Sequence, residues 1–208
     1  MCRTTFALLV KGSIRRVTSC VPVHAFKSCL SFRLTESRMS AKEVIVKLVK
    51  YDRRTFEAFE RGIQRRGWPE AIADRGIGHH SFKDTLVHIL NVHEAWLIGA
   101  AQGRWDFFKD PSRKRENVRS WSNLRRYRTR VWAGVDELVA GLTEKRLHRR
   151  VKVPWMRGHY TLEDAFFQSS FEQAHHLGEI IGAYWQMDRA PPQMMWIPTM
   201  LRTRVSVR

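Results

Sequence analysis

Apolar residues recur at helical spacing in four separate stretches of the chain, and the first of them opens at Ser40. Glu43 follows three residues later, which is the spacing of a capping box, in which each side chain satisfies the backbone donor of the other residue. The stripe continues to Gly67, and Trp68-Pro69 ends it. Its apolar members are Ile45, Leu48, Val49, Phe56, Phe59 and Ile63. The pattern predicts a long amphipathic helix.

Three further stretches have the same character, roughly residues 81–102, 120–142 and 161–187. The first and last of these open on Ser or Thr, with Asp84 and Asp164 at the capping spacing. Four long amphipathic helices without alternating strands predict an all-α fold, a four-helix bundle.

A short extended stretch, Arg149 to Val153, precedes the fourth predicted helix, and Gly158 offers a turn. We therefore expect a small β-hairpin before the last helix. No apolar run approaches the roughly 18 residues needed to span a bilayer. We expect a cytoplasmic protein without a membrane partner.

The first 38 residues differ in composition from the rest. They hold all three cysteines of the chain, and seven basic residues against one acid, Glu36. Neither a disulfide framework nor a cysteine metal cluster therefore holds the main domain together. We expect residues 1–38 to be a poorly structured extension, residues 39–201 the bundle domain and residues 202–208 a basic tail. The extension is interpreted as a targeting segment or as the product of a start assigned upstream of Met39, and the second interpretation is favoured.

The charge balance raises a competing function. The chain has 37 Lys and Arg against 20 Asp and Glu, a net charge of +17. Three basic groups could line a polyanion, and three tryptophans near them could stack on bases. The basic groups are Arg113 to Arg115; Arg125, Arg126, Arg128 and Arg130; and Lys145, Arg146, Arg149 and Arg150. The tryptophans are Trp105, Trp121 and Trp155. No known nucleic-acid-binding motif is present, so a basic nucleic-acid binder is the alternative, and we expect any polyanion binding to be nonspecific.

Polar residues also occupy the fourth predicted helix where a core is expected. His176 falls inside the apolar arc, and His175 falls on the opposite, polar side. Glu172 lies at the boundary, one turn before His176, so an acid and an imidazole at i and i+4 can share a cation. A hydrogen-bonded core histidine and a solvated stripe of ion pairs are the alternative interpretations of these residues.

The second predicted helix offers His88 and His93. They are about 140° apart around the helix axis, so they do not easily serve one site together. Periodicity alone favours His93 slightly as the buried residue and leaves the choice of ligand open.

Several motifs, in order and spacing, resemble the DinB-like family of four-helix-bundle proteins. They cover nearly all of residues 40–199 and lie at residues 51–63, 81–89, 142–147, 160–165, 175–181 and 189–192. The resemblance implies a divalent-metal site of three histidines, one on the second helix and an H-x-x-x-H pair on the fourth. By resemblance His88 and His176 take the first and last positions, and Glu172 stands at the middle one.

Two imidazoles and one carboxylate are a recognised ligand set that leaves positions open for substrate. The resemblance therefore implies a site of His88, Glu172 and His176 for zinc, nickel or manganese, with Glu179 in its second shell. The implied activity is that of a metal-dependent hydrolase, or of an S-transferase that uses a low-molecular-weight thiol, acting on a small-molecule substrate. A non-catalytic scaffold bundle is a further alternative, and a second copy of the chain is a candidate partner.

Overall fold

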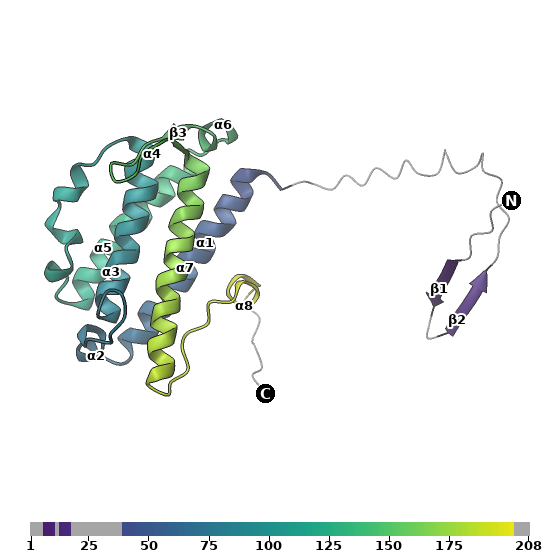
Figure 1. The fold of residues 1–208 in the computed structure, drawn as a ribbon, viewed down its shortest axis with the longest axis horizontal. Helices are drawn as coiled ribbons and strands as arrows, with labels where there is room; N and C mark the ends of the chain where they lie inside the picture. Colours follow the sequence, from purple (N-terminus) through teal and green to yellow (C-terminus); the bar gives the residue numbers. More distant parts are fainter. Residues whose placement is uncertain (1–5, 11–12, 18–38, 202–208) are drawn as a thin grey trace. The chain divides into compact units, whose positions relative to one another are not determined.

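The computed structural model describes residues 6–10, 13–17 and 39–201, and the chain divides into two units at residues 38 and 39 (Figure 1). In the first unit, strands β1 (Phe6–Val10) and β2 (Ser13–Val17) pair antiparallel, with Val10 opposite Ser13. The expectation of a poorly structured extension did not include these strands, because five-residue strands are too short for a sustained alternation. The rest of the expected N-terminal extension lies outside the described residues.

The second unit contains the predicted four-helix bundle, which is confirmed. Its long helices are α1 (Ala41–Gln64), α3 (Phe82–His93), α5 (Trp121–Ala140) and α7 (Leu162–Gln186). Their apolar faces meet in one continuous core. Shorter helical elements lie between them: α2 (Trp68–Ile72), η2 (Glu94–Gly99), α4 (Ala100–Gln102), η3 (Asp106–Lys109), η4 (Pro111–Arg113), η5 (Arg115–Asn117) and α6 (Glu144–Leu147). The short helix α8 (Trp196–Leu201) follows α7.

The helix starts follow the capping chemistry of the sequence. Ser40 and Glu43 form a reciprocal capping box at the start of α1, and Thr161 and Asp164 form another at the start of α7. The expected hairpin before α7 is also present. It consists of β3 (Arg150–Val151) and β4 (Tyr160–Thr161), which pair antiparallel.

The second predicted helix is interrupted, which the periodicity did not indicate. α3 ends at His93 and continues as a π-helical turn, η2, before α4. Glu94, the first residue of that turn, is buried and accepts a hydrogen bond from the Tyr127 hydroxyl at 2.9 Å. Its carboxylate also lies 3.2 Å from Arg113 and 3.3 Å from Arg130. This buried ion cluster ties the segment between α4 and α5 to the bundle.

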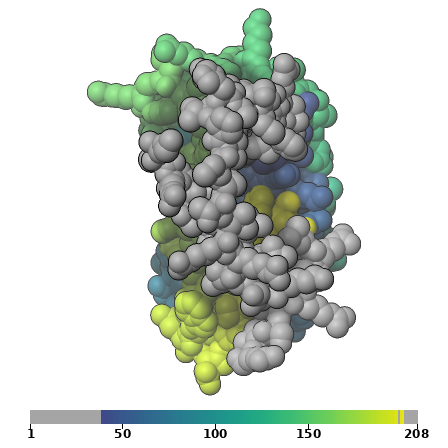
Figure 2. Space-filling model, turned by 90° about the vertical axis from the view of Figure 1, so that its right-hand side faces the viewer, coloured from purple at the N-terminus to yellow at the C-terminus, as the bar shows by residue number. Residues whose placement is uncertain are grey.

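The segment after α7 returns to α1. The Tyr51 and Trp196 rings lie 5.1 Å apart, and the Arg54 guanidinium donates to the carbonyl of Thr199 at 3.0 Å. Figure 2 shows yellow atoms of this C-terminal segment beside the blue of α1. The expected basic tail, residues 202–208, lies outside the described residues. None of the described helices is long and apolar enough to cross a membrane.

A buried polar network joins α1, α3 and α7. The Gln173 side-chain amide donates to the Asp52 carbonyl at 2.8 Å and to the Thr55 hydroxyl at 2.9 Å. Its oxygen accepts a hydrogen bond from His93 Nε2 at 2.8 Å, so the His93 proton lies on Nε2. The other ring nitrogen of His93 accepts from the Ser169 hydroxyl at 2.6 Å. Burial lowers the pKa of His93 to about 4, so this histidine is a neutral core residue.

Asp52 makes the stability of the bundle depend on pH. Burial raises the pKa of its carboxyl from 3.8 to about 7, against the opposing effect of the hydrogen bond from Ser170. Because the folded pKa lies above the unfolded one, the protonated carboxyl stabilises the fold fully only below about pH 4. That contribution is lost as the pH rises through about 7.

We expect Asp52→Asn to remove this dependence, because the amide keeps an acceptor for Ser170 and carries no charge. Between about pH 5 and pH 8, the unfolding free energy of the wild type should fall by about 2–3 kcal/mol relative to the variant. Urea denaturation of both proteins at the two pH values measures the difference. Parallel pH profiles would show that Asp52 does not ionise in this range.

Candidate metal centre

Helix α7 positions His176 between two carboxylates of its own surface. Its Nδ1 lies 3.0 Å from Glu179 Oε2, one turn further along the helix. Its Nε2 lies 3.5 Å from Glu172 Oε2, one turn earlier. A carboxylate only accepts hydrogen bonds, so the bond to Glu179 places the His176 proton on Nδ1 and leaves the lone pair of Nε2 free.

Two further imidazoles converge on His176. The His88 ring, from the middle of α3, lies edge-on to it with ring centres 4.5 Å apart. The His79 ring, from the loop before α3, lies 4.9 Å from His176 and stacks on His88 at 3.9 Å. One ring nitrogen from each of the three histidines lies within 4.8 Å of the other two. His176 is buried, and the other two are half-buried.

The loop that carries His79 is held by short local contacts. The Arg75 amide donates to the His80 carbonyl at 2.6 Å, and the His80 amide donates to the Ile77 carbonyl at 2.7 Å. Gly76 has a φ of 66° and His80 has a φ of 63°, so the chain turns through the left-handed region twice. This tight turn directs His79 toward α7 immediately before α3 begins.

Gly78 allows this loop to approach Glu179. A Cβ atom at position 78 would lie 2.6 Å from Glu179 Oε1, closer than real side chains come. The missing side chain therefore leaves room for the carboxylate that orients His176. The loop thus supplies one imidazole and the space for the partner of another.

Two of the three imidazoles, those of His79 and His88, are neutral. Burial, with the charges of His79, His176 and Arg115, lowers the pKa of His88 to about 3. Burial also lowers the pKa of His79, with a further contribution from the charge of His176. Neutral imidazole is the form that binds a metal, because one of its ring nitrogens carries no proton. A cation would therefore not have to displace a proton from His79 or His88.

The predicted residues fall into three groups. The structure brings His88 and His176 together and places Glu172 beside His176, with its other oxygen accepting from Gln168 at 2.9 Å. His93 belongs to the buried network, and His175 is exposed. His79 was missed by the sequence reasoning, because a loop residue has no helical phase; its signal was the Gly-x-Gly-His-His run just before the Ser81 cap.

Some members of the basic groups are engaged within the protein, whereas others are exposed. Arg128 pairs with Glu60, and Arg130 pairs with Asp110 and Glu94. Trp121 packs on Trp68, while Trp105 and Trp155 pack on each other, 5.3 Å apart. Internal pairing and packing account for these side chains without a nucleic acid.

The donor set fits a divalent cation. Three imidazoles and one carboxylate are ligands that zinc, nickel and manganese accept, and Glu179 accepts a hydrogen bond from the other ring nitrogen of His176, as a carboxylate beside a metal-bound histidine usually does. The cluster also lies among helices, where many bundles build their metal sites. The fold and this cluster define a helical bundle with a candidate metal centre between α3 and α7.

The family model of the DinB superfamily matches residues 50–180. Because the match covers more than half of the sequence, the chain belongs to the DinB superfamily. No curated protein matches the sequence.

The contact between Gly78 and Glu179 is testable by Gly78→Ala. The added methyl should displace the Glu179 carboxylate from His176 Nδ1, and the lost charge-assisted hydrogen bond should cost about 1–2 kcal/mol of stability. Imidazole ¹⁵N NMR reports the His176 proton directly, and urea denaturation reports the stability.

The matched control is Gly178→Ala, on α7 beside Glu179, where a Cβ meets nothing within 4 Å. It should leave the His176 signals unchanged and add about 0.5–1 kcal/mol of helix stability. Unchanged His176 signals in Gly78→Ala would show that the glycine does not maintain the Glu179 contact.

Proposed function

We propose that this protein is a metal-dependent enzyme whose cation is held by His79, His88, His176 and Glu172. The observation that carries the proposal is the convergence of three imidazoles within 4.8 Å, one of them oriented by Glu179. Surface histidines seldom gather in this way, because three rings that can each become charged repel one another. Burial lowers the pKa of His79 and of His88, which keeps these two half-buried rings in the neutral form that a metal site needs.

Each residue has a separate role in the proposed site. His79 and His88 supply uncharged nitrogen donors, and Glu179 holds the proton of His176 on Nδ1 so that Nε2 is available to the cation. Glu172, with its side chain 34% exposed, supplies negative charge on the solvent side. A divalent cation at this centre would lower the pKa of a water molecule or thiol placed on it.

The reaction is then the attack of an activated nucleophile on a small electrophile, as in a hydrolase or an S-transferase. Residues 39–201 contain no cysteine, so a thiol nucleophile for this unit comes from a separate low-molecular-weight thiol. Adding such a thiol to the cobalt-loaded protein distinguishes the two reactions. A sulfur-to-cobalt charge-transfer band supports the S-transferase, and an unchanged spectrum favours the hydrolase.

The ligand assignment predicts the effect of single substitutions. His79→Ala, His88→Ala and His176→Ala should each weaken zinc binding by at least about 100-fold, because each removes one donor from the set. His175→Ala is the matched control, adjacent to His176 but exposed, and should change the affinity by less than about 3-fold. Isothermal calorimetry measures all five proteins, and equal affinities throughout would refute the site.

Glu172 should determine the preference among metals. Glu172→Gln keeps the size and the Gln168 neighbour but removes the charged oxygen donor, which hard cations prefer. We expect its manganese affinity to fall by about 10-fold or more and its zinc affinity to fall less. An equal change for both metals, or no change, would exclude Glu172 from the ligand set and leave the three imidazoles.

A further inference from the structure

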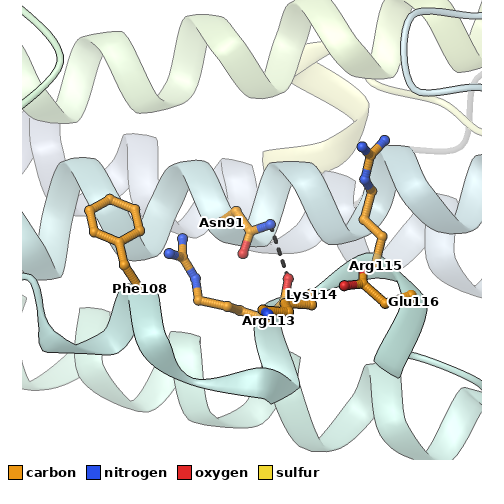
Figure 3. Close-up of a pocket in the computed structure, with 6 residues that line it drawn as sticks. All are labelled: Asn91, Phe108, Arg113, Lys114, Arg115 and Glu116. Atoms are coloured by element: carbon orange, nitrogen blue, oxygen red, sulfur yellow. Dashed lines mark hydrogen bonds between the residues drawn. The ribbon is translucent and has the colours of Figure 1, made fainter.

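We infer that Arg115 and the pocket beside it bind the carboxylate of a singly charged organic acid, presented to the candidate metal centre. The inference rests on the proposed function and names the substrate class for that site. The pocket has a volume of about 350 Å³ and is lined by Asn91, Phe108, Arg113, Lys114, Arg115 and Glu116 (Figure 3).

The backbone of this pocket is fixed on both sides of His88. The Lys83 ammonium donates to the Arg115 carbonyl at 3.0 Å, and the Asn91 amide donates to the Arg113 carbonyl at 3.3 Å. Lys83 and Asn91 lie on α3 before and after His88. The segment 113–115 therefore runs along α3 next to the candidate metal centre.

The side chains of Arg113 and Arg115 leave this segment in different directions (Figure 3). Arg113 is buried, pairs with Glu94 and lies over the Phe108 ring at 4.4 Å. Arg115 is exposed and has no ion pair within the described part of the chain. Its backbone carbonyl accepts from Lys83, which precedes His88 on α3, so Arg115 lies beside the part of α3 that leads to this imidazole.

The charges at the pocket indicate one negative group on the ligand. Glu94 pairs with Arg113, and the formal charges of the other lining residues, Lys114, Arg115 and Glu116, sum to one positive charge. One positive charge is then left, which suits a monoanion. A guanidinium matches the planar carboxylate with two parallel hydrogen bonds, and the 40% exposed Phe108 ring offers an apolar wall for the carbon chain.

The test uses two metal-chelating probes on the cobalt-loaded full chain. Succinate monohydroxamate carries a carboxylate, whereas acetohydroxamate is the same chelator without one. The ratio of their dissociation constants, read from the visible spectrum at constant ionic strength, measures the contribution of the added carboxymethyl group, and comparison with the charge variants assigns the part due to the carboxylate. The wild type should prefer the carboxylate-bearing probe by about 10-fold or more.

Three variants locate this preference. Arg115→Gln should abolish it, and Arg115→Lys should keep part of it, because the charge remains without the planar fork. Lys109→Gln removes one positive charge from a nearby segment outside the pocket and should keep the full preference. Acetohydroxamate should bind all four proteins equally.

The outcomes separate the inference from the function on which it rests. If acetohydroxamate binds and Arg115→Gln retains the preference, the inference is wrong and the metal centre stands. If Lys109→Gln loses as much of the preference as Arg115→Gln, the effect is general electrostatics and the inference is also wrong. If the wild type binds neither cobalt nor acetohydroxamate, the proposed function fails, and the inference fails with it.

Discussion

The Gln173 side chain fixes how α7 lies against α1 and α3, and the candidate site depends on that register. Its amide must satisfy a donor and an acceptor inside the core, which it does with Asp52 and Thr55 on α1 and with His93 on α3. Leaving any of these groups unpaired would cost about 1–3 kcal/mol. A one-turn slip of α7 would break all three contacts together, so the bundle holds this alignment.

The geometry of the imidazoles follows from that alignment. α3 and α7 run antiparallel, with His93 against Gln173 near one end and Phe82 against Tyr184, 5.4 Å apart, near the other. His88 on α3 is therefore brought opposite His176 on α7. The core network and the candidate metal centre are thus successive layers of the same helix pair. His93 in the network is a structural residue kept neutral by burial, whereas His88 in the other layer is half-buried.

The sequence predicted the four helices and two of the three histidines of the candidate metal centre, but not the third. Periodicity placed His176 inside the apolar arc and His175 outside it, and capping spacings located the starts of α1 and α7, because both signals are local. The π-helical turn after His93 depends on Glu94 meeting Arg113 and Arg130 from distant segments, which no local pattern records. His79 reaches the site through a loop whose path is set by Gly76, Gly78 and Glu179, so its role needed three-dimensional structure.

We propose that His79, a loop histidine, completes a metal site between two helices. X-ray absorption spectroscopy of the zinc-loaded protein tests it most directly, because outer-shell scattering from imidazole rings counts the histidines bound to the metal. We expect three imidazoles in the wild type and two in His79→Ala, with one oxygen donor retained from Glu172. The same imidazole count in both proteins would contradict it.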